Sequence, residues 1–342
     1  MIVDLFGGVG GWIEGLPSDT DHRSVELDPL AAAASRSAGH QVIEADVTAL
    51  DPTEFAPVTG LTGSPPCQPW SVSGTGEGRA DRDRVLSAVS GRRPALDHRT
   101  RLTVEPLRWI RTLRPEWVAL EQVPPVLPVW RAYADRLTDW GYATAVGVVD
   151  AADYGVPQSR RRAVLIANRT GAVALPEPTP RISISAALNL PADDPRQLRS
   201  NYSGHVPGNS ARTAAERGRT MRTLDQQSVT ITRRPPQWLF PDGDRVALTV
   251  PETAVLQGFP PSFPFQGTIS DQRLQCGNAV PPPLARSLIH AASHPVGPMP
   301  RPSTVTIGVH IPRDLHRRLK LAAVEHDSTL QEMVLEALRG RV

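Results

Sequence analysis

Cysteine and lysine are both scarce in this 342-residue chain. The two cysteines, Cys67 and Cys276, are too few and too far apart for a disulfide framework or a cysteine-rich metal site. We therefore expect no bound metal and a reducing, cytoplasmic location. Lys320 is the only lysine, so almost all of the 37 basic residues are arginines. The planar fork of arginine suits phosphate and guanine, although genome composition could produce the same bias.

Long apolar runs are missing as well. No stretch reaches the roughly 20 apolar residues that a membrane span needs, and the N-terminus has no signal-peptide pattern. A formal net charge of +2 is too small, taken alone, to indicate a nucleic-acid partner. Hydrophobic residues make up 40% of the chain, which is enough for a packed core, and the length exceeds that of one average domain.

Short apolar strands alternate with helices in the N-terminal part of the chain. Helices are predicted around residues 31–34 and 102–113. Strands are predicted at residues 1–6, 24–27, 60–63 and 117–120, with a further strand that ends at Asp46. This alternation predicts an α/β fold with a parallel, doubly wound sheet, whose ligands bind beyond the carboxyl ends of the strands.

Ligand-type residues follow three of these strands. The segment "DLFGGVGG" at 4–11 places glycines where a backbone turns tightly and approaches a ligand, but it lacks the Gly-Lys-Ser/Thr of a phosphate loop. Glu26 ends the second strand and suits a ribose diol. Asp46 could accept a hydrogen bond from an adenine amino group. Tight turns and surface acids are the alternative interpretation, but three successive strand ends favour a nucleotide-like ligand.

The segment "GSPPCQPWS" at 63–71 gives Cys67 an unusual setting. Pro65, Pro66 and Pro69 fix backbone angles around the cysteine. A small buried cysteine has no need of such neighbours, whereas a nucleophile for covalent catalysis must be held in place. Cys276 has no comparable setting, and we interpret it as a buried hydrophobic residue.

Further segments occur in a fixed order and, together with the two quoted above, span residues 2 to about 293. They are "VELD" at 25–28, "ADV" at 45–47, "EQV" at 121–123, "DYGVPQSRRR" at 153–162, "LTVPETAVLQGFP" at 248–260 and "QCGNAVPPPLARSL" at 275–288. In this order they resemble the DNA (cytosine-5)-methyltransferase family. The resemblance implies a Rossmann-like class I methyltransferase sheet with a small target-recognition domain, which acts on double-stranded DNA.

The resemblance also implies a chemistry. Cys67 would add to carbon 6 of a cytosine flipped out of the duplex, so that carbon 5 can attack the methyl group of S-adenosyl-L-methionine and leave S-adenosyl-L-homocysteine. The carboxyl group of Glu121 would lie at N3 of the base. Arg160 and Arg162 alternate along an extended segment and would face the base and a nearby phosphate. A solvated basic run is the alternative interpretation.

Other positions of this sequence match the family's ligand contacts. Substrate contacts are expected at Gln68, Ser71 and Gln158. Cofactor contacts are expected at Phe6, Gly8, Gly10, Gly11, Glu26, Leu27, Asp46, Val47, Pro66, Leu102, Asn278 and Val280. Asn278 and Val280 are far along the chain, so their segment must fold back beside the first strand. Gln122 departs from the family, which usually has asparagine there, and this departure puts the local backbone hydrogen bonding in doubt.

The resemblance divides the chain into five parts. We expect a catalytic and S-adenosylmethionine-binding domain at 1–167, a target-recognition region at 168–221 and a return to the catalytic domain at 222–292. Within the first part, the glycine- and arginine-rich residues 71–101 are expected to form the mobile loop that closes over the base. A proline-rich linker at 293–303 precedes a separate segment at 304–342.

The C-terminal segment has its own pattern. "TVTIGVHI" at 304–311 alternates as a strand, Pro312 opens a helix, and Ser328 with Gln331 forms a capping-box pattern at the start of a second helix. This small strand-helix-helix module resembles a ribbon-helix-helix domain, which pairs two chains into a homodimer through the strand and places it in a DNA groove. A dimerisation or docking tail without DNA contact is the alternative.

Two other function classes stay open from sequence. The cytosine could lie in RNA, as in the tRNA-methylating branch of the family, although the recognition segment and the tail favour DNA. The chain could also be a non-catalytic DNA-binding regulator, although intact Cys67, Glu121, Arg160 and Arg162 favour an enzyme. In a restriction-modification system, a cognate restriction endonuclease would be a further partner.

Overall fold

The computed structural model describes residues 1–71, 76–191, 193–201, 220–299, and a few residues between 315 and 322. By internal contacts the chain forms two compact units, Met1–Pro300 and Arg301–Val342. The predicted strand-helix-helix module at 304–342 therefore lies almost entirely outside the described residues. Within the described part, no helix is long and apolar enough to cross a membrane.

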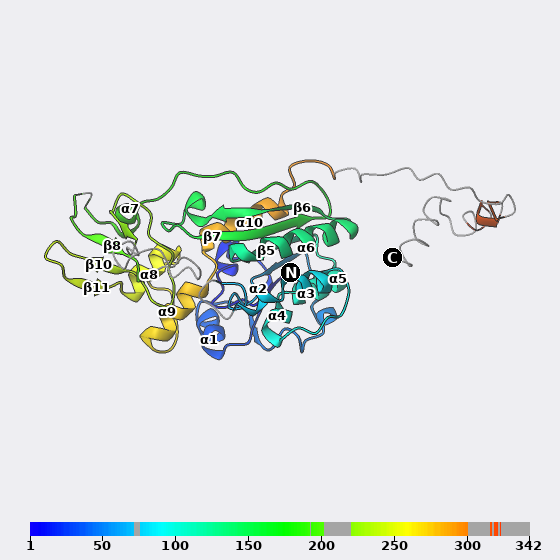
Figure 1. Ribbon diagram of the computed structural model, residues 1–342, viewed down its shortest axis with the longest axis horizontal. Coiled ribbons are helices and arrows are strands. Elements are labelled where there is room, and N and C mark those ends of the chain that lie inside the picture. The colour runs from blue at the N-terminus through cyan, green and yellow to red at the C-terminus, as the bar shows by residue number, and fades with distance from the viewer. Residues whose placement is uncertain are drawn as a thin grey trace. The chain divides into compact units, whose positions relative to one another are not determined.

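A seven-stranded sheet forms the centre of the first unit (Figure 1). Its strand order is β3-β2-β1-β4-β5-β7-β6. In that order the strands are β3 (Val42–Glu44), β2 (His22–Glu26), β1 (Ile2–Leu5), β4 (Gly60–Gly63), β5 (Trp117–Gln122), β7 (Arg161–Asn168) and β6 (Ala143–Asp150). The order confirms the predicted α/β methyltransferase-type fold.

The direction of one strand corrects the expectation of a wholly parallel sheet. β7 is antiparallel to both β5 and β6. The connection between β6 and β7 contains only the short 3-10 helix η4 (Ala151–Tyr154) and a few loop residues, and such a connection joins antiparallel strands rather than parallel ones. The third strand also ends at Glu44, before Asp46, which lies in the following turn.

Helices cover both faces of the sheet. On one face α3 (Arg82–Val89), α5 (Glu105–Leu113) and α6 (Leu127–Asp139) enclose a core that includes Trp109 and Trp130. On the other face α10 (Pro282–Ser293) packs against alternate strand residues such as Ile166. Successive strand residues point to opposite faces, so both clusters draw on the same strands.

The stretch predicted as a closing loop is partly helical. It contains α2 (Glu77–Ala80) and α3 before α4 (His98–Leu102). The helix predicted over residues 102–113 is divided into α4 and α5, since Thr103 and Val104 interrupt it and Pro106 stands in the first turn of α5, where proline is tolerated.

A smaller antiparallel sheet lies beyond the large one within the first unit, together with α7 (Ile184–Leu188), α8 (Val250–Gln257) and α9 (Ile269–Asn278) (Figure 1). Its strands, in spatial order, are β11 (Arg245–Ala247), β10 (Gln237–Leu239), β8 (Gln197–Arg199) and β9 (Met221–Arg222). Leu198, Trp238 and Phe259 belong to its hydrophobic core. The expected boundary at residue 221 therefore falls inside this sheet.

Candidate active site

The glycine-rich loop after β1 has a tightly constrained backbone. Phe6 has φ 59°, and Gly8 and Gly10 have φ 56° and 94°, so three residues of the loop are left-handed. That conformation costs free energy at a residue with a side chain, and it is typical of ligand loops. An added Cβ at Gly8 would project into open space, whereas one at Gly11 would lie 2.1 Å from the Val280 carbonyl oxygen.

The segment at 278–280 does fold back beside this loop, as predicted. Val280 is buried against Gly11, and Asn278 is exposed at the end of α9. The glycine at position 11 is required because two backbones meet there without room for a side chain. Residues separated by most of the chain are therefore brought together at the carboxyl end of β1.

Glu26 is fixed at the carboxyl end of β2. Its Oε2 accepts a hydrogen bond from the Gly8 amide at 2.8 Å, and its Oε1 accepts one from the Asp28 amide at 2.7 Å. Burial raises the pKa of this carboxyl group above its usual range. Next to it, Leu27 is 60% exposed, an unusual setting for a large apolar side chain. Both residues were predicted to contact the cofactor, and they lie together beside the glycine loop.

Asp46 begins the turn that follows β3. Its Oδ1 accepts hydrogen bonds from the amide and the hydroxyl group of Thr48, both at 2.8 Å. The Thr48 amide is the largest influence that lowers the pKa of Asp46, so the carboxylate stays ionised. Val47 is buried, and so is Leu102, which belongs to the same core cluster.

Asp4 is a functional candidate that sequence reasoning missed. It is completely buried within β1, where its Oδ1 accepts a hydrogen bond from Thr62 Oγ1 at 2.8 Å. Ser24 Oγ donates to Oδ2 at 3.5 Å. Burial raises the pKa of Asp4 to about 7, with the nearby Glu26 carboxylate adding to the effect. The available signal was an acid inside an otherwise apolar strand, directly before the glycine loop.

Cys67 lies in a tight turn after β4. The amides of Trp70 and Ser71 both donate to the Cys67 carbonyl oxygen, at 3.0 and 2.8 Å. Trp70 is completely buried, which anchors the turn, whereas Cys67 and Pro66 are half-buried. Burial raises the pKa of the Cys67 thiol; the positive charge of Arg162 opposes this shift, and the charge of Glu121 adds to it.

Glu121 and Arg162 form a buried ion pair. Arg162 Nε lies 2.7 Å from Glu121 Oε1, and the two side chains are 12% and 8% exposed. Glu121 lies near the end of β5 and Arg162 near the start of the antiparallel β7, so the two strands present them at the same edge of the sheet. Gln122, the residue after Glu121, donates a hydrogen bond to the Pro65 carbonyl oxygen, so the Cys67 turn lies at the same edge of the sheet.

Gln122 resolves the doubt raised by its departure from the family. Its Nε2 donates to the Pro65 carbonyl oxygen, and its Oε1 accepts from the Val123 amide at 2.6 Å. The side chain thus connects the Cys67 turn to the end of β5. Local backbone hydrogen bonding is kept with glutamine at this position.

Arg160 and Gln158 lie inside the protein rather than on an open face. Arg160 is 3% exposed and donates to three backbone carbonyl oxygens: Ile231 at 3.2 Å, Gly277 at 3.0 Å and Ala279 at 3.2 Å. Burial lowers the pKa of Arg160 to about 9.

The side-chain amide of Gln158 also forms its hydrogen bonds inside the protein. Its Nε2 donates to Leu256 O and Gln257 Oε1, at 3.0 and 2.6 Å, and its Oε1 accepts from the Ile231 amide at 2.8 Å. Gln158 and Arg160 therefore bind segments that come later in the chain, around residues 231, 256 and 278. Of the three predicted residues, Arg162 alone pairs with Glu121. Gln68, by contrast, is exposed, and Ser71 is half-buried beside Cys67.

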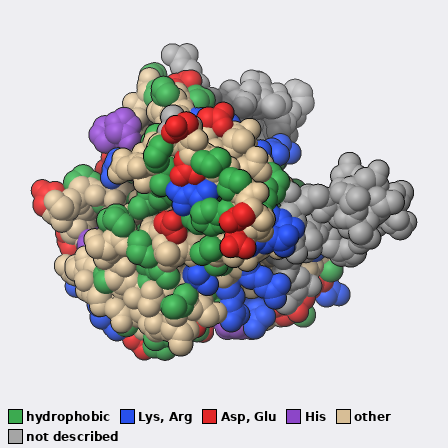
Figure 2. Space-filling model, turned by 90° about the vertical axis from the view of Figure 1, so that its left-hand side faces the viewer, with side chains coloured by type: hydrophobic (Ala, Val, Ile, Leu, Met, Phe, Trp, Pro, Cys, Tyr) green, Lys and Arg blue, Asp and Glu red, His purple; other side chains and the backbone are tan. Residues whose placement is uncertain are grey.

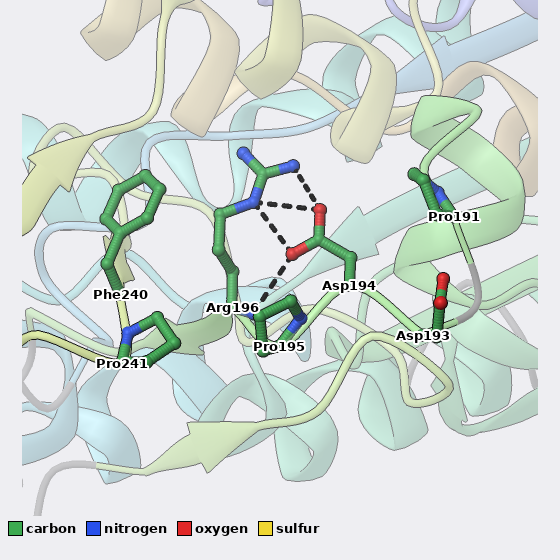
Figure 3. Close-up of a pocket in the computed structure, with 7 residues that line it drawn as sticks. All are labelled: Pro191, Asp193, Asp194, Pro195, Arg196, Phe240 and Pro241. Carbon is green, nitrogen blue, oxygen red and sulfur yellow. Dashed lines mark hydrogen bonds and ion pairs between the residues drawn. The ribbon is translucent and has the colours of Figure 1, made fainter.

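A shallow pocket of about 430 Å³ lies in the smaller sheet's part of the chain (Figure 3). It is lined by Pro191, Asp193, Asp194, Pro195, Arg196, Phe240 and Pro241. The Asp194 carboxylate holds Arg196 at 2.6 Å, and the guanidinium lies 4.9 Å from the Trp238 ring centroid. These contacts pair Asp194 with Arg196, and the lining contains none of the candidate site residues.

The residues present fit a nucleoside-type methyl donor. Open space lies over Gly8, and Glu26 is fixed beside it at the end of the next strand. Asp46 is held in a turn beyond the third strand end. In the described parts of the chain, no group of His, Cys, Asp and Glu side chains has an arrangement suited to a metal ion.

Comparison with known proteins identifies the family of this chain. The model of the C-5 cytosine-specific DNA methylase family matches residues 1–203 and 195–294. The type II methyltransferase M1.HphI of Haemophilus parahaemolyticus is 29% identical over 332 residues, which cover 84% of this chain and 85% of that protein. M.NaeI of Lentzea aerocolonigenes is 29% identical over 324 residues, covering 84% and 73%.

A solved structure supports the fold. The crystal structure of a DNMT2 mutant from Spodoptera frugiperda superposes with a TM-score of 0.60 at 16% identity, covering 85% of this chain and 98% of that one. The family match includes the glycine loop, the Cys67 turn, β5, β7 and the returning segment at 278–280. The chain belongs to the C-5 cytosine-specific DNA methylase family.

Proposed function

We propose that this chain methylates carbon 5 of cytosine in a specific sequence of duplex DNA, as a DNA (cytosine-5-)-methyltransferase. One observation carries the proposal: in a member of this family, the turn with the half-buried Cys67 is joined by the Gln122–Pro65 hydrogen bond to the end of β5, which presents the buried Glu121–Arg162 pair. A thiol, a carboxyl group and a guanidinium are the groups that activation of a cytosine ring requires.

Cys67 supplies the nucleophile. Its thiolate forms a bond to carbon 6 of the flipped base, and the electron pair of the 5,6 double bond moves to carbon 5 and is delocalised through carbon 4 onto N3. Because burial raises the pKa of Cys67, the resting group is a thiol, and Arg162 favours the loss of its proton. Carbon 5 then has enamine character and becomes the nucleophile.

Glu121 and Arg162 stabilise the negative charge that the attack creates on the ring. A proton held between the Glu121 carboxyl group and N3 of the base neutralises the ring as electrons arrive there. Arg162, 2.7 Å from Glu121 Oε1, fixes that carboxyl group and is the cation next to the reacting base. After methylation carbon 5 loses its proton to solvent, and the electron pair left behind re-forms the 5,6 double bond. The Sγ–C6 bond breaks with its electron pair on sulfur, which restores the Cys67 thiolate, and the N3 proton returns to Glu121.

S-adenosyl-L-methionine supplies the electrophilic methyl group when bound. Glu26 would receive the ribose hydroxyl groups, and Asp46 the adenine amino group. The other residues that would surround the donor are Phe6, Gly8, Gly10, Gly11, Leu27, Val47, Pro66, Leu102, Asn278 and Val280. The close approach of Gly11 to Val280 supports this grouping, since it brings the glycine loop and the returning segment at 278–280 into contact.

The smaller sheet is the candidate target-recognition element. In the face shown in Figure 2, a cluster of basic side chains occupies the lower part, with acidic side chains among and above it, and a basic cluster suits a phosphate backbone. Arg233 and Arg234 are exposed in the segment that leads into β10. The type II names of the relatives favour a cognate restriction endonuclease as a partner of this enzyme.

Bisulfite sequencing of DNA from cells that express the chain tests the proposal and identifies the target. We expect protected cytosines at one recurring sequence, and none in cells that express Cys67→Ser. Transfer of tritiated methyl groups to duplex DNA and to tRNA should be compared with the same preparation. Labelling of tRNA alone would assign the chain to RNA instead.

The C-terminal segment is proposed to pair two chains. A single alternating strand leaves its backbone groups unpaired, so a second copy is needed to complete it. Light scattering should find a dimer for the full chain and a monomer for a chain that ends at Pro298. The same oligomeric state for both would refute the pairing.

A further inference from the structure

Arg108, which the motifs above do not include, joins helix α5 to the turn that carries Asp46. Its Nη2 donates to the Val47 carbonyl oxygen at 2.9 Å, and its Nη1 donates to the Leu50 carbonyl oxygen at 3.1 Å. The turn follows β3 and is neither helix nor strand at these positions. One side chain therefore fixes the turn at two points.

The guanidinium itself is held in place. Its Nε donates to Glu105 Oε1 at 2.6 Å, and Glu105 is only 12% exposed. Its Nη2 is also ion-paired with the same carboxylate oxygen, so the carboxylate and the two carbonyl oxygens together engage all three nitrogen atoms of one planar group. Lysine could not reproduce this arrangement, because an ammonium group is a single point with no fork.

Bonds inside the turn orient Asp46. Thr48 donates twice to Asp46 Oδ1, and the Ala49 amide donates to the Asp46 carbonyl oxygen at 3.0 Å. These bonds set the direction of the Asp46 carboxylate relative to the turn. The bonds from Arg108 set the turn relative to α5, and the buried Val47 side chain secures it against the core.

We infer that Arg108 is a positioning residue for recognition of the donor's adenine ring. The inference rests on the proposed function, in which Asp46 accepts a hydrogen bond from the adenine amino group. Arg108 acts through the backbone of Val47 and Leu50 and does not touch the donor. Its loss should therefore reduce discrimination at the adenine amino position and not only weaken binding.

Calorimetry without DNA tests this inference. S-adenosylhomocysteine and S-inosylhomocysteine differ at the position where the first carries the amino group and the second a carbonyl oxygen. The wild-type chain should bind the adenosyl compound more tightly. In Arg108→Ala the affinity for that compound should fall about tenfold, the effect of losing one hydrogen bond to a charged group, and the ratio between the two compounds should fall with it.

Arg111→Ala is the matched control, since Arg111 is exposed on the same helix and should leave both affinities unchanged. Asp46→Ala gives the ratio of the two affinities that is expected when adenine recognition is lost. If Arg108→Ala does not fold, as judged by circular dichroism, Arg108→Gln carries the test, because its amide can still donate to one carbonyl oxygen.

The outcomes separate the inference from the proposed function. A normal ratio in the Arg108 variant beside a reduced ratio in Asp46→Ala would overturn the role of Arg108 and leave the donor site in place. A normal ratio in both would overturn the role of Asp46 as well. A reduced ratio in both, with Arg111→Ala normal, is the expected result.

Discussion

The backbone of Gly11 lies directly against the backbone of Val280, and a Cβ at Gly11 would come within 2.1 Å of the Val280 carbonyl oxygen. We expect Gly11→Ala to push the two segments apart, with a loss of roughly 1–3 kcal/mol in the free energy of unfolding, as for other overpacked sites. Affinity for S-adenosylmethionine, measured by calorimetry, should fall too.

Gly297→Ala is the control for that substitution, because a Cβ there meets no atom within 4 Å. Its free energy of unfolding should stay within about 0.5 kcal/mol of wild type. Equal behaviour of the two variants would show that the contact of Gly11 with Val280 does not constrain the loop.

The charges around Cys67 should control its reactivity with iodoacetamide. Below the thiol pKa, the alkylation rate should rise about tenfold per pH unit, because the thiolate is the reacting species. Arg162→Gln removes the cation that lowers the pKa, so alkylation at a given pH should slow. Glu121→Gln removes the charge that raises the pKa, so alkylation should quicken. Rates that do not differ among the three proteins would contradict this electrostatic coupling; Cys67→Ser identifies any signal from Cys276.

Asp4 should make stability depend on pH. Its pKa is about 7 in the folded protein, whereas the ordinary pKa of an aspartate side chain is 3.8, so the folded state binds the extra proton between these values. Stability contributed by protonated Asp4 is therefore present below about pH 4 and is lost as pH rises to about 7.

Asp4→Asn removes this titration. The free energy of unfolding of the variant minus that of wild type should rise by roughly 4 kcal/mol from pH 4 to pH 8. This value is an upper bound set by the pKa shift of Asp4. Urea unfolding at the two pH values measures the difference. If this difference in the free energy of unfolding is the same at both pH values, Asp4 titrates normally.

Substitution of Arg160 should lower the free energy of unfolding more than substitution of Arg161. Arg160→Lys keeps a positive charge but cannot reach three carbonyl oxygens, so the free energy of unfolding should fall by roughly 1–3 kcal/mol. Arg161→Lys, at an exposed position one residue along, should change it little. Similar losses in both variants would indicate that the carbonyl contacts of Arg160 contribute nothing specific.

Much of the large sheet could be predicted because its strands are short apolar segments with glycines or acids at their ends. Gly60–Gly63 was predicted with the bounds that the structure shows. The direction of β7 was missed, since apolar patterning is the same for parallel and antiparallel strands, and only the length of the connection after β6 distinguishes them.

Within the site, Arg160 and Gln158 were the residues that sequence described least well. Alternation correctly separates Arg161 from its neighbours, but it cannot say whether a face is open or covered. The groups that cover this face, Ile231, Gly277 and Ala279, lie far along the chain. Their approach depends on the packing of α9 and the segment before β10, which no local pattern encodes.

The most direct measurement of the central claim is a covalent trap. Duplex DNA that contains the target with 5-fluorocytosine should form a denaturation-resistant adduct with the chain when S-adenosylmethionine is present, because fluorine cannot leave carbon 5 as a proton does. Cys276→Ser should form the adduct and Cys67→Ser should not, as judged by gel mobility and peptide mass. An adduct that survives Cys67→Ser would contradict the assignment of Cys67 as the nucleophile.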